Sequence, residues 1–175
     1  MPVNAPLAAM FEYARWATLA VFDAAAARPD ALSQPIPNTD RSLRDLLRHL
    51  ASSQDVFVAR LRGEDQFPVM ARWREWPGME SARAAAAASA DALTAIAGET
   101  DPAADVFIAQ GFEYPPGSGQ RSEISRAFLL THAFSHGCLH REQACAALSA
   151  AGAEAPDLDG WGYAAVAEVM RPLPR

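Results

Sequence analysis

The amino-acid sequence predicts an all-α protein, a four-helix bundle with long inter-helix connections. Large apolar side chains recur at helical intervals of three and four residues over four segments. Clusters of proline and glycine separate these segments. Half of the 175 residues are hydrophobic and no internal repeat is present, so we expect residues 1–175 to form a single domain. Amphipathic helices of this kind favour a bundle over a solenoid or an α/β sheet.

The first helix is expected from about Pro6 to Ala27. Asn4 precedes it and is a suitable N-cap, and Pro29 ends the helical pattern. Its apolar positions follow the helical period: Leu7, Met10, Phe11, Ala14, Trp16, Leu19, Val21 and Phe22. We therefore expect one face of this segment to be buried.

The second helix is expected to begin after Ser42, another suitable N-cap residue, and to end at Gly63. Its apolar positions are Leu43, Leu46, Leu47, Leu50, Val56, Phe57 and Leu61. Residues 64–78 combine prolines and tryptophans with a final glycine. That composition predicts a long crossing loop.

The third helix is expected from about Met79 to Ala97 and is dense in alanine, the best helix former. It has few large apolar side chains, so it packs either closely or peripherally. Between residues 101 and 120, Val106–Ile108 and Phe112–Tyr114 precede the turn-forming stretch Pro115–Gly119. This pattern predicts short extended pieces or a short hairpin before the last long helix.

The fourth helix is expected to open at Ser122 and to close at Gly152. A short terminal helix is expected to follow, through about Met170. Because the connections before the third and fourth helices are long, we do not expect a simple up-down-up-down bundle.

Charge and composition exclude several classes of partner. The formal net charge is -6, the isoelectric point is near 5.1, and every basic residue is arginine. A nucleic-acid partner is not expected, because binding a phosphate backbone needs a clustered basic face. No apolar stretch reaches the roughly 20 residues that span a bilayer, and no secretory signal is evident, so we expect no membrane partner and a cytoplasmic location.

The two cysteines, Cys138 and Cys145, fall seven residues apart on one expected helix. The helical rise alone separates them by about 10 Å, too far for a disulfide. Each is interpreted as a small buried apolar residue, and a reactive thiol is the alternative.

The histidines form the main functional pattern. Three of the four fall on the last long helix as His132-x3-His136-x3-His140. Two histidines four residues apart lie on one helical face and can bind one metal ion at about 2.1 Å. All three cannot share one ion, because His132 and His140 are offset by about 12 Å along the axis. The spacing leaves open which pair binds the metal, and a third ligand must come from another helix.

His49 is the remaining histidine and lies beside the apolar stripe of the second helix. An imidazole buried without a partner is costly, whereas one facing a histidine pair completes three-point coordination. The alternative interpretations are a hydrogen-bonded core histidine for His49 and a solvated pair on the last helix. We favour the metal interpretation, because all four histidines occupy mid-helix positions.

These residues also carry a family resemblance. The stretch Leu129–Gln143 resembles the H-x3-H-x3-H-R-x-Q signature of the DinB/YfiT-like (damage-inducible) superfamily of metal-binding four-helix bundles. Phe11–Trp16 is similar to the aromatic first-helix pattern of that family, and Leu46–Leu50 to its second-helix ligand segment. The tail Pro156–Asp159 is similar as well, so the resemblance covers nearly the whole chain.

The resemblance implies a four-helix bundle, commonly a homodimer, with a divalent metal held by His49, His136 and His140. His132 would then be a neighbour that does not contact the metal. Two positions depart from the family pattern. Glu142 replaces a frequent glycine, which changes the local charge, and Ser135 replaces a frequent asparagine.

Three neutral ligands leave at least one coordination position for water or substrate. Imidazole suits several metals, of which we expect zinc, with nickel as the alternative. The resemblance implies a metal- and thiol-dependent S-transferase or isomerase that uses a low-molecular-weight thiol as cosubstrate. Four loop aromatics are candidate walls of an electrophile pocket, although each taken singly is better interpreted as packing: Trp73, Trp76, Phe112 and Tyr114.

Two rival hypotheses come from other functional classes. A metal closed by a fourth protein ligand would indicate a non-catalytic metal-binding stress-response protein. A chain without metal would be a helical interaction protein.

Asp45, one turn before His49, is a candidate for orienting that ring, with a solvated surface acid as the alternative.

Overall fold

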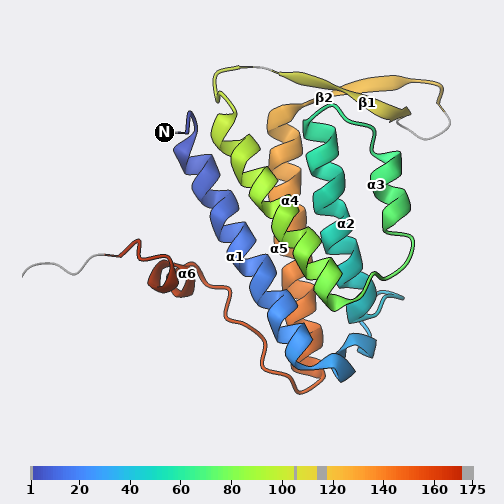
Figure 1. Ribbon diagram of the computed structural model, residues 1–175, viewed down its shortest axis with the longest axis vertical. Coiled ribbons are helices and arrows are strands. Elements are labelled where there is room, and N and C mark those ends of the chain that lie inside the picture. The colour runs from blue at the N-terminus through green and yellow to red at the C-terminus, as the bar shows by residue number, and fades with distance from the viewer. Residues whose placement is uncertain (1, 105, 114–117, 171–175) are drawn as a thin grey trace, which may run out of the picture.

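The computed structural model describes residues 2–104, 106–113 and 118–170 (Figure 1). It confirms the predicted all-α bundle with a small two-stranded sheet. The elements in chain order are α1 (Ala5–Ala27), the 3-10 helix η1 (Pro29–Ser33), α2 (Leu43–Leu61), α3 (Phe67–Arg72), α4 (Met79–Glu99), β1 (Phe107–Glu113), β2 (Arg121–Ser125), α5 (Arg126–Ala150) and α6 (Gly160–Val166).

The four long helices form the bundle, and α1 and α2 each pack against both α4 and α5. In Figure 1, α1 and α5 descend while α2 and α4 ascend. The segment from residue 62 to residue 78, which includes α3, returns the chain along the side of the bundle so that α2 and α4 run parallel. The β1–β2 hairpin crosses one end of the bundle between α4 and α5.

Two helix starts follow the predicted caps. The Asn4 side chain accepts a hydrogen bond from the Leu7 backbone N–H at 3.2 Å. Ser42 and Asp45 form a capping box at the start of α2, in which each side chain accepts from the other residue's backbone N–H. Side-chain oxygens at these positions satisfy amide groups that have no partner within the helix.

Two local predictions need correction. Helix α5 begins at Arg126, and the residue that caps it is Ser125, whose side chain accepts from the Phe128 N–H at 3.1 Å. Ser122, the predicted start, lies in β2. The predicted crossing loop contains the short helix α3, and η1 follows α1 directly.

The predicted hairpin is confirmed as an antiparallel pair in which Ile108 lies opposite Ile124. The predicted turn Pro115–Gly119 lies only partly within the described residues, which exclude 114–117. Tyr114 therefore lies outside them, and the side chain of Phe112 is not among those described.

Helix α4 packs closely and not peripherally. Ala82, Ala86, Ala90 and Ala97 are buried, so small side chains let the backbone of α4 approach its neighbours. At Gly98, a Cβ atom would lie 3.1 Å from the Cβ of Pro2, which leaves little room for a larger residue. Among the described residues, no helix has the length and apolar character needed to cross a bilayer.

The core consists of two apolar clusters, one toward each end of the bundle. The cluster near the α1–η1 connection includes Phe22, Leu47 and Leu148, and the cluster near the hairpin includes Leu61 and Leu129. Between them lies a belt of buried polar side chains: Thr18 on α1, Gln54 on α2 and Arg141 on α5. The histidines of α2 and α5 lie beside this belt.

Candidate metal centre

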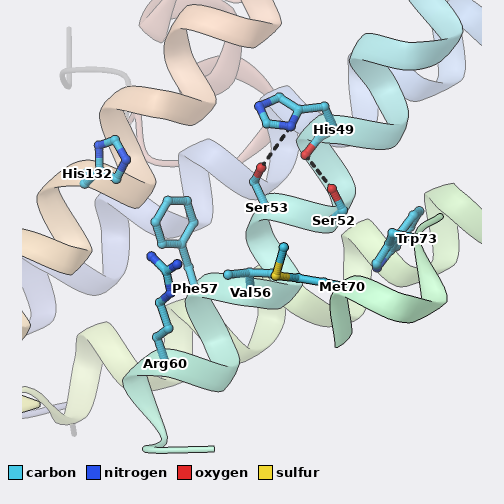
Figure 2. A pocket seen from close by; sticks show the side chains of 9 residues that line it. All are labelled: His49, Ser52, Ser53, Val56, Phe57, Arg60, Met70, Trp73 and His132. Atoms are coloured by element: carbon cyan, nitrogen blue, oxygen red, sulfur yellow. Dashed lines mark hydrogen bonds between the residues drawn. The ribbon is translucent and has the colours of Figure 1, made fainter. Parts of the chain in front are cut away.

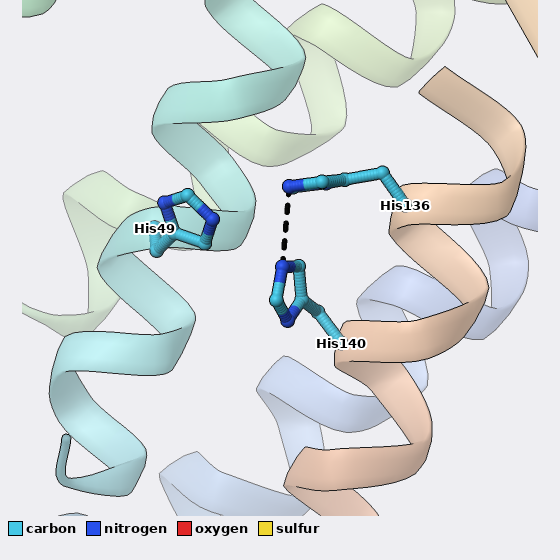
Figure 3. Close-up of side chains that lie close together, drawn as sticks. All are labelled: His49, His136 and His140. Atoms are coloured by element: carbon cyan, nitrogen blue, oxygen red, sulfur yellow. Dashed lines mark hydrogen bonds between the residues drawn. The ribbon is translucent and has the colours of Figure 1, made fainter. Parts of the chain in front are cut away.

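Three of the histidines meet between α2 and α5 (Figure 3). One ligand atom each from His49, His136 and His140 lies within 4.8 Å of the others. The Nε2 atoms of His136 and His140 are 3.1 Å apart. Tetrahedral coordination at about 2.1 Å separates ligand nitrogens by about 3.4 Å, close to this spacing. The group could therefore hold a divalent metal ion.

His136 and His140 are the pair that the spacing left open, and His132 lies outside the group. Its exposed ring stacks on Phe128, with centroids 5.9 Å apart, and meets the edge of Phe57 at 5.3 Å. It is still a close neighbour, because its ring centroid lies 5.6 Å from that of His136.

Hydrogen bonds select which ring nitrogens are available to a metal. His140 Nδ1 lies 2.7 Å from Gln143 Oε1, an amide oxygen that can only accept, so Nδ1 carries the proton. The neutral ring then has its lone pair on Nε2, which faces His136. His49 Nδ1 lies 3.5 Å from the Ser53 hydroxyl, and the other nitrogen of the ring is turned toward the α5 pair (Figure 3).

Burial keeps these imidazoles neutral. Removal from water, reinforced by the charge that His140 would carry, lowers the pKa of His49 to about 4 and that of His136 to about 3. Burial also lowers the pKa of His140, opposed in part by its hydrogen bond to Gln143. Because metal ligands must be deprotonated, this environment presents three lone pairs at neutral pH.

Two acids near the site do not contact it. Asp45 does not orient His49, because its carboxylate accepts from the Ser42 hydroxyl at 2.6 Å and its other oxygen lies 3.8 Å from Arg48. Glu142 is exposed on α5. The residues that orient the rings are instead Gln143 and Ser53, which lie one turn after His140 and His49 respectively.

A pocket of about 320 Å³ opens beside His49, between α2, α3 and α5 (Figure 2). Its apolar lining residues are Val56, Phe57, Met70 and Trp73. Its polar lining residues are His49, Ser52, Ser53, Arg60 and His132. A molecule in this pocket would therefore contact apolar walls, hydroxyl groups and a guanidinium next to the histidine cluster.

Of the four loop aromatics predicted as candidate walls, Trp73 lines this pocket. It is buried, and its Nε1–H donates to Asp55 Oδ2 at 2.7 Å, which fixes the ring between α2 and α3. Trp76 packs partly buried against the core cluster near the α1–η1 connection. Arg60 and Met70 also line the pocket and were not predicted, because nothing in their local pattern shows that α3 folds back onto α2.

Both cysteines are free, and neither lines the pocket. Cys138 Sγ accepts from the buried guanidinium of Arg141 at 3.1 Å. Burial raises the pKa of Cys145 to about 11, so that thiol is protonated at neutral pH. Both thiols therefore lie outside the pocket, next to which the three histidines cluster.

Comparison with known proteins gives one match. The model of a family described as the DinB family matches residues 1–171, nearly the whole chain. No curated protein and no solved structure matches the chain significantly. The match agrees with the family resemblance of the histidine signature.

Proposed function

Because the chain belongs to the DinB family, we propose that it binds one divalent metal ion through His49, His136 and His140 and is a metal- and thiol-dependent S-transferase or isomerase. Its substrates would be a low-molecular-weight thiol and a small electrophile. The observation that carries this proposal is the convergence of three neutral imidazoles at the edge of a pocket. Zinc is the expected metal, and nickel is the alternative.

The number of protein ligands supports an enzyme over a closed structural site. Within the part of the chain that the structure describes, the ligand group has three members. Three protein ligands are typical of catalytic zinc sites, whereas structural sites have four. A bound divalent cation lowers the pKa of a thiol and so supplies thiolate at neutral pH.

The pocket residues would position the electrophile. Phe57, Met70 and Trp73 offer apolar surface that excludes water from its carbon skeleton. The hydroxyl of Ser53 and the guanidinium of Arg60 are donors for negative charge that develops on it. In transfer, the thiol would lose its proton to solvent, a sulfur–carbon bond would form while the bond to the leaving group breaks, and the departing anion would take a proton from solvent. In isomerisation, the thiol adds to a double bond and leaves again after rotation.

Metal analysis tests the ligand set. We expect one metal per chain in the native protein and a loss of stoichiometric metal in His136→Ala. The matched control is His132→Ala, which removes an imidazole from the same helix and should keep the metal. Unchanged occupancy in His136→Ala, or loss in His132→Ala, would contradict the assignment.

An activity assay tests the reaction. The native protein, a chelated sample and His140→Ala are compared across several thiols with a chromogenic electrophile. Of these three samples, we expect turnover only in the native protein. The variant Cys138→Ala should be as active as the native protein. Background rates for every thiol with full metal occupancy would favour the non-catalytic stress-response hypothesis. Activity that survives chelation but is lost in Cys138→Ala would move the chemistry to a protein thiol.

A further inference from the structure

A second cleft, of about 620 Å³, lies on another side of His49. Its lining is mostly polar and charged: Asp40, Arg41, Asp45, Arg48, His49, Ser52, Trp73 and Arg74. Three arginines face two aspartates there, although the chain as a whole carries a net charge of -6. The cleft therefore carries a local excess of positive charge.

Part of the charge in the cleft is already engaged. Arg48 donates to the backbone carbonyl of Arg74 at 2.8 Å, and its other terminal nitrogen lies 3.8 Å from Asp45. Asp45 also accepts from the Ser42 hydroxyl and N–H in the capping box. Arg48 therefore joins the α3–α4 connection to α2. The carboxylate of Asp45 accepts most of its hydrogen bonds from Ser42, the N-cap of its own helix.

The guanidinium groups of Arg41 and Arg74 are not engaged in this way. Neither makes a side-chain hydrogen bond or ion pair with another residue in ranges 2–104, 106–113 and 118–170. They come from two different connections, one before α2 and one before α4, and both line the same cleft. Two guanidinium groups therefore line one cavity against the single remaining carboxylate of Asp40, and this balance of charge favours an anionic ligand.

The cleft adjoins the candidate metal centre. Three residues line both this cleft and the pocket of about 320 Å³ described above, which we call the apolar-walled pocket: His49, Ser52 and Trp73. The two cavities therefore meet at His49. A ligand anchored by Arg41 could thus reach the metal centre with its other end.

We propose that the cleft lined by Arg41 and Arg74 binds a carboxylate or phosphate group of the thiol cosubstrate. The assignment to the thiol rests on the proposed function, and the anion site itself does not. The apolar-walled pocket would then hold the electrophile, so the two substrates approach His49 from separate cavities.

The first arm of the test measures anion binding without metal or thiol. Succinate is titrated calorimetrically into the metal-free full chain and into Arg41→Gln, Arg74→Gln and Arg44→Gln. Arg44 is the matched control, because it lies on the first turn of α2 outside the cleft and its replacement changes net charge equally. We expect binding that weakens about ten-fold in Arg41→Gln and Arg74→Gln and is retained in Arg44→Gln. Undetectable binding at millimolar succinate, or equal weakening in all three variants, would overturn the anion site.

The second arm assigns the anion to a substrate. The zinc-loaded full chain is titrated with 3-mercaptopropionate, 2-mercaptoethanol and cysteamine, which carry an anion, no charge and a cation beside the thiol. We expect the carboxylate thiol to bind about ten-fold tighter than the neutral one, with the ratio near one in Arg41→Gln. Equal affinities together with succinate binding would overturn the assignment to the thiol. Failure of every thiol to bind, with succinate still bound, would count against the proposed function and the thiol assignment but leave the anion site standing.

Discussion

Gln143 controls the proton position on His140, since its Oε1 accepts from Nδ1 at 2.7 Å. Replacement by alanine removes this acceptor and lets the ring rotate or change tautomer. We expect Gln143→Ala to weaken metal affinity about 10- to 100-fold, the effect typical of removing a partner of a ligating histidine. Competition with a chromogenic chelator measures this constant.

Gln143→Glu is the matched control for this prediction. A carboxylate at the same position is still an acceptor for Nδ1–H, so metal affinity should be kept or raised. If Gln143→Ala and Gln143→Glu weaken binding equally, the hydrogen bond does not orient His140. A proportional loss of helical content in Gln143→Ala would instead show that the residue acts on folding.

The pKa values predict how acid affects the metal-free protein. In the unfolded chain His49 and His136 titrate near 6.5, whereas burial lowers their folded pKa to about 4 and about 3. The unfolded state therefore binds more protons below pH 6.5. This contribution to the free energy of unfolding is complete above pH 6.5 and is lost as the pH falls toward about 4 for His49 and about 3 for His136. Urea unfolding with a chelator at pH 7.5, 6 and 5 measures the loss.

The double variant His49→Gln, His136→Gln separates this effect from other titrating groups. Without the two imidazoles, stability should fall less steeply between pH 7.5 and pH 5. An equal slope in the native protein and the variant would contradict the prediction.

At the level of single residues, the sequence predicts what depends on local spacing. His136 and His140 are four apart on one helix, so their convergence follows from helix geometry. The contact of His49 with them depends on how α2 packs on α5. His49 could be predicted as the third ligand only because it is the one histidine outside the last long helix. Arg41 and Arg74 could not be predicted as neighbours, because the 32 residues between them must fold before they line one cleft.

At the scale of one element, two nearby serines are both suitable N-cap residues for α5, and the structure places them differently. Ser125 caps the helix and Ser122 lies in β2. We expect Ser125→Ala to lower the free energy of unfolding by about 1 kcal/mol, because the Phe128 N–H loses its acceptor. Chemical denaturation of both alanine variants measures the difference.

Ser122→Ala is the control and should stay within about 0.5 kcal/mol of the native protein. The reverse order of the two effects would restore Ser122 as the start of the helix. Ser122 was the wrong prediction, because serine is favourable at the N-cap of any helix and either serine fits locally. The strand register that pairs Ile124 with Ile108 decides where β2 ends and α5 begins.

Helix ends marked by strong caps or breakers were predictable, and short elements were not. Asn4 and Ser42 cap their helices as predicted. Helix α3 has only 6 residues, too few for intrinsic helix propensity to stabilise. It is held by contacts such as that of Trp73 with Asp55, which join distant parts of the chain.

At the scale of the whole molecule, we predict a homodimer. Helix α6 covers part of the aromatic surface of α1, where Tyr163 packs against Tyr13 and Trp16. The same helix leaves Trp161 76% exposed and Val166 63% exposed. A second copy of the chain would remove this apolar surface from water. Light scattering at micromolar concentration should give twice the mass of the chain.

The double variant Trp161→Ser, Val166→Ser should shift the equilibrium toward monomer. Val3→Ser is the control, since Val3 is also 68% exposed but lies near the other end of the chain. A native protein with the mass of one chain would remove the prediction. An equal dimer dissociation constant in the two variants would show that the interface does not include α6.

The path of the chain between α2 and α4 has a consequence for how this protein could diversify. The histidines lie on the long helices α2 and α5, whereas Met70, Trp73 and Arg74 lie on the segment that returns along the side of the bundle. Insertions or exchanges in that segment would alter which molecules are accepted while leaving the ligand geometry intact. If the proposed function holds, a chimera that carries a different return segment on the same four helices should keep metal binding and change which small molecules it accepts.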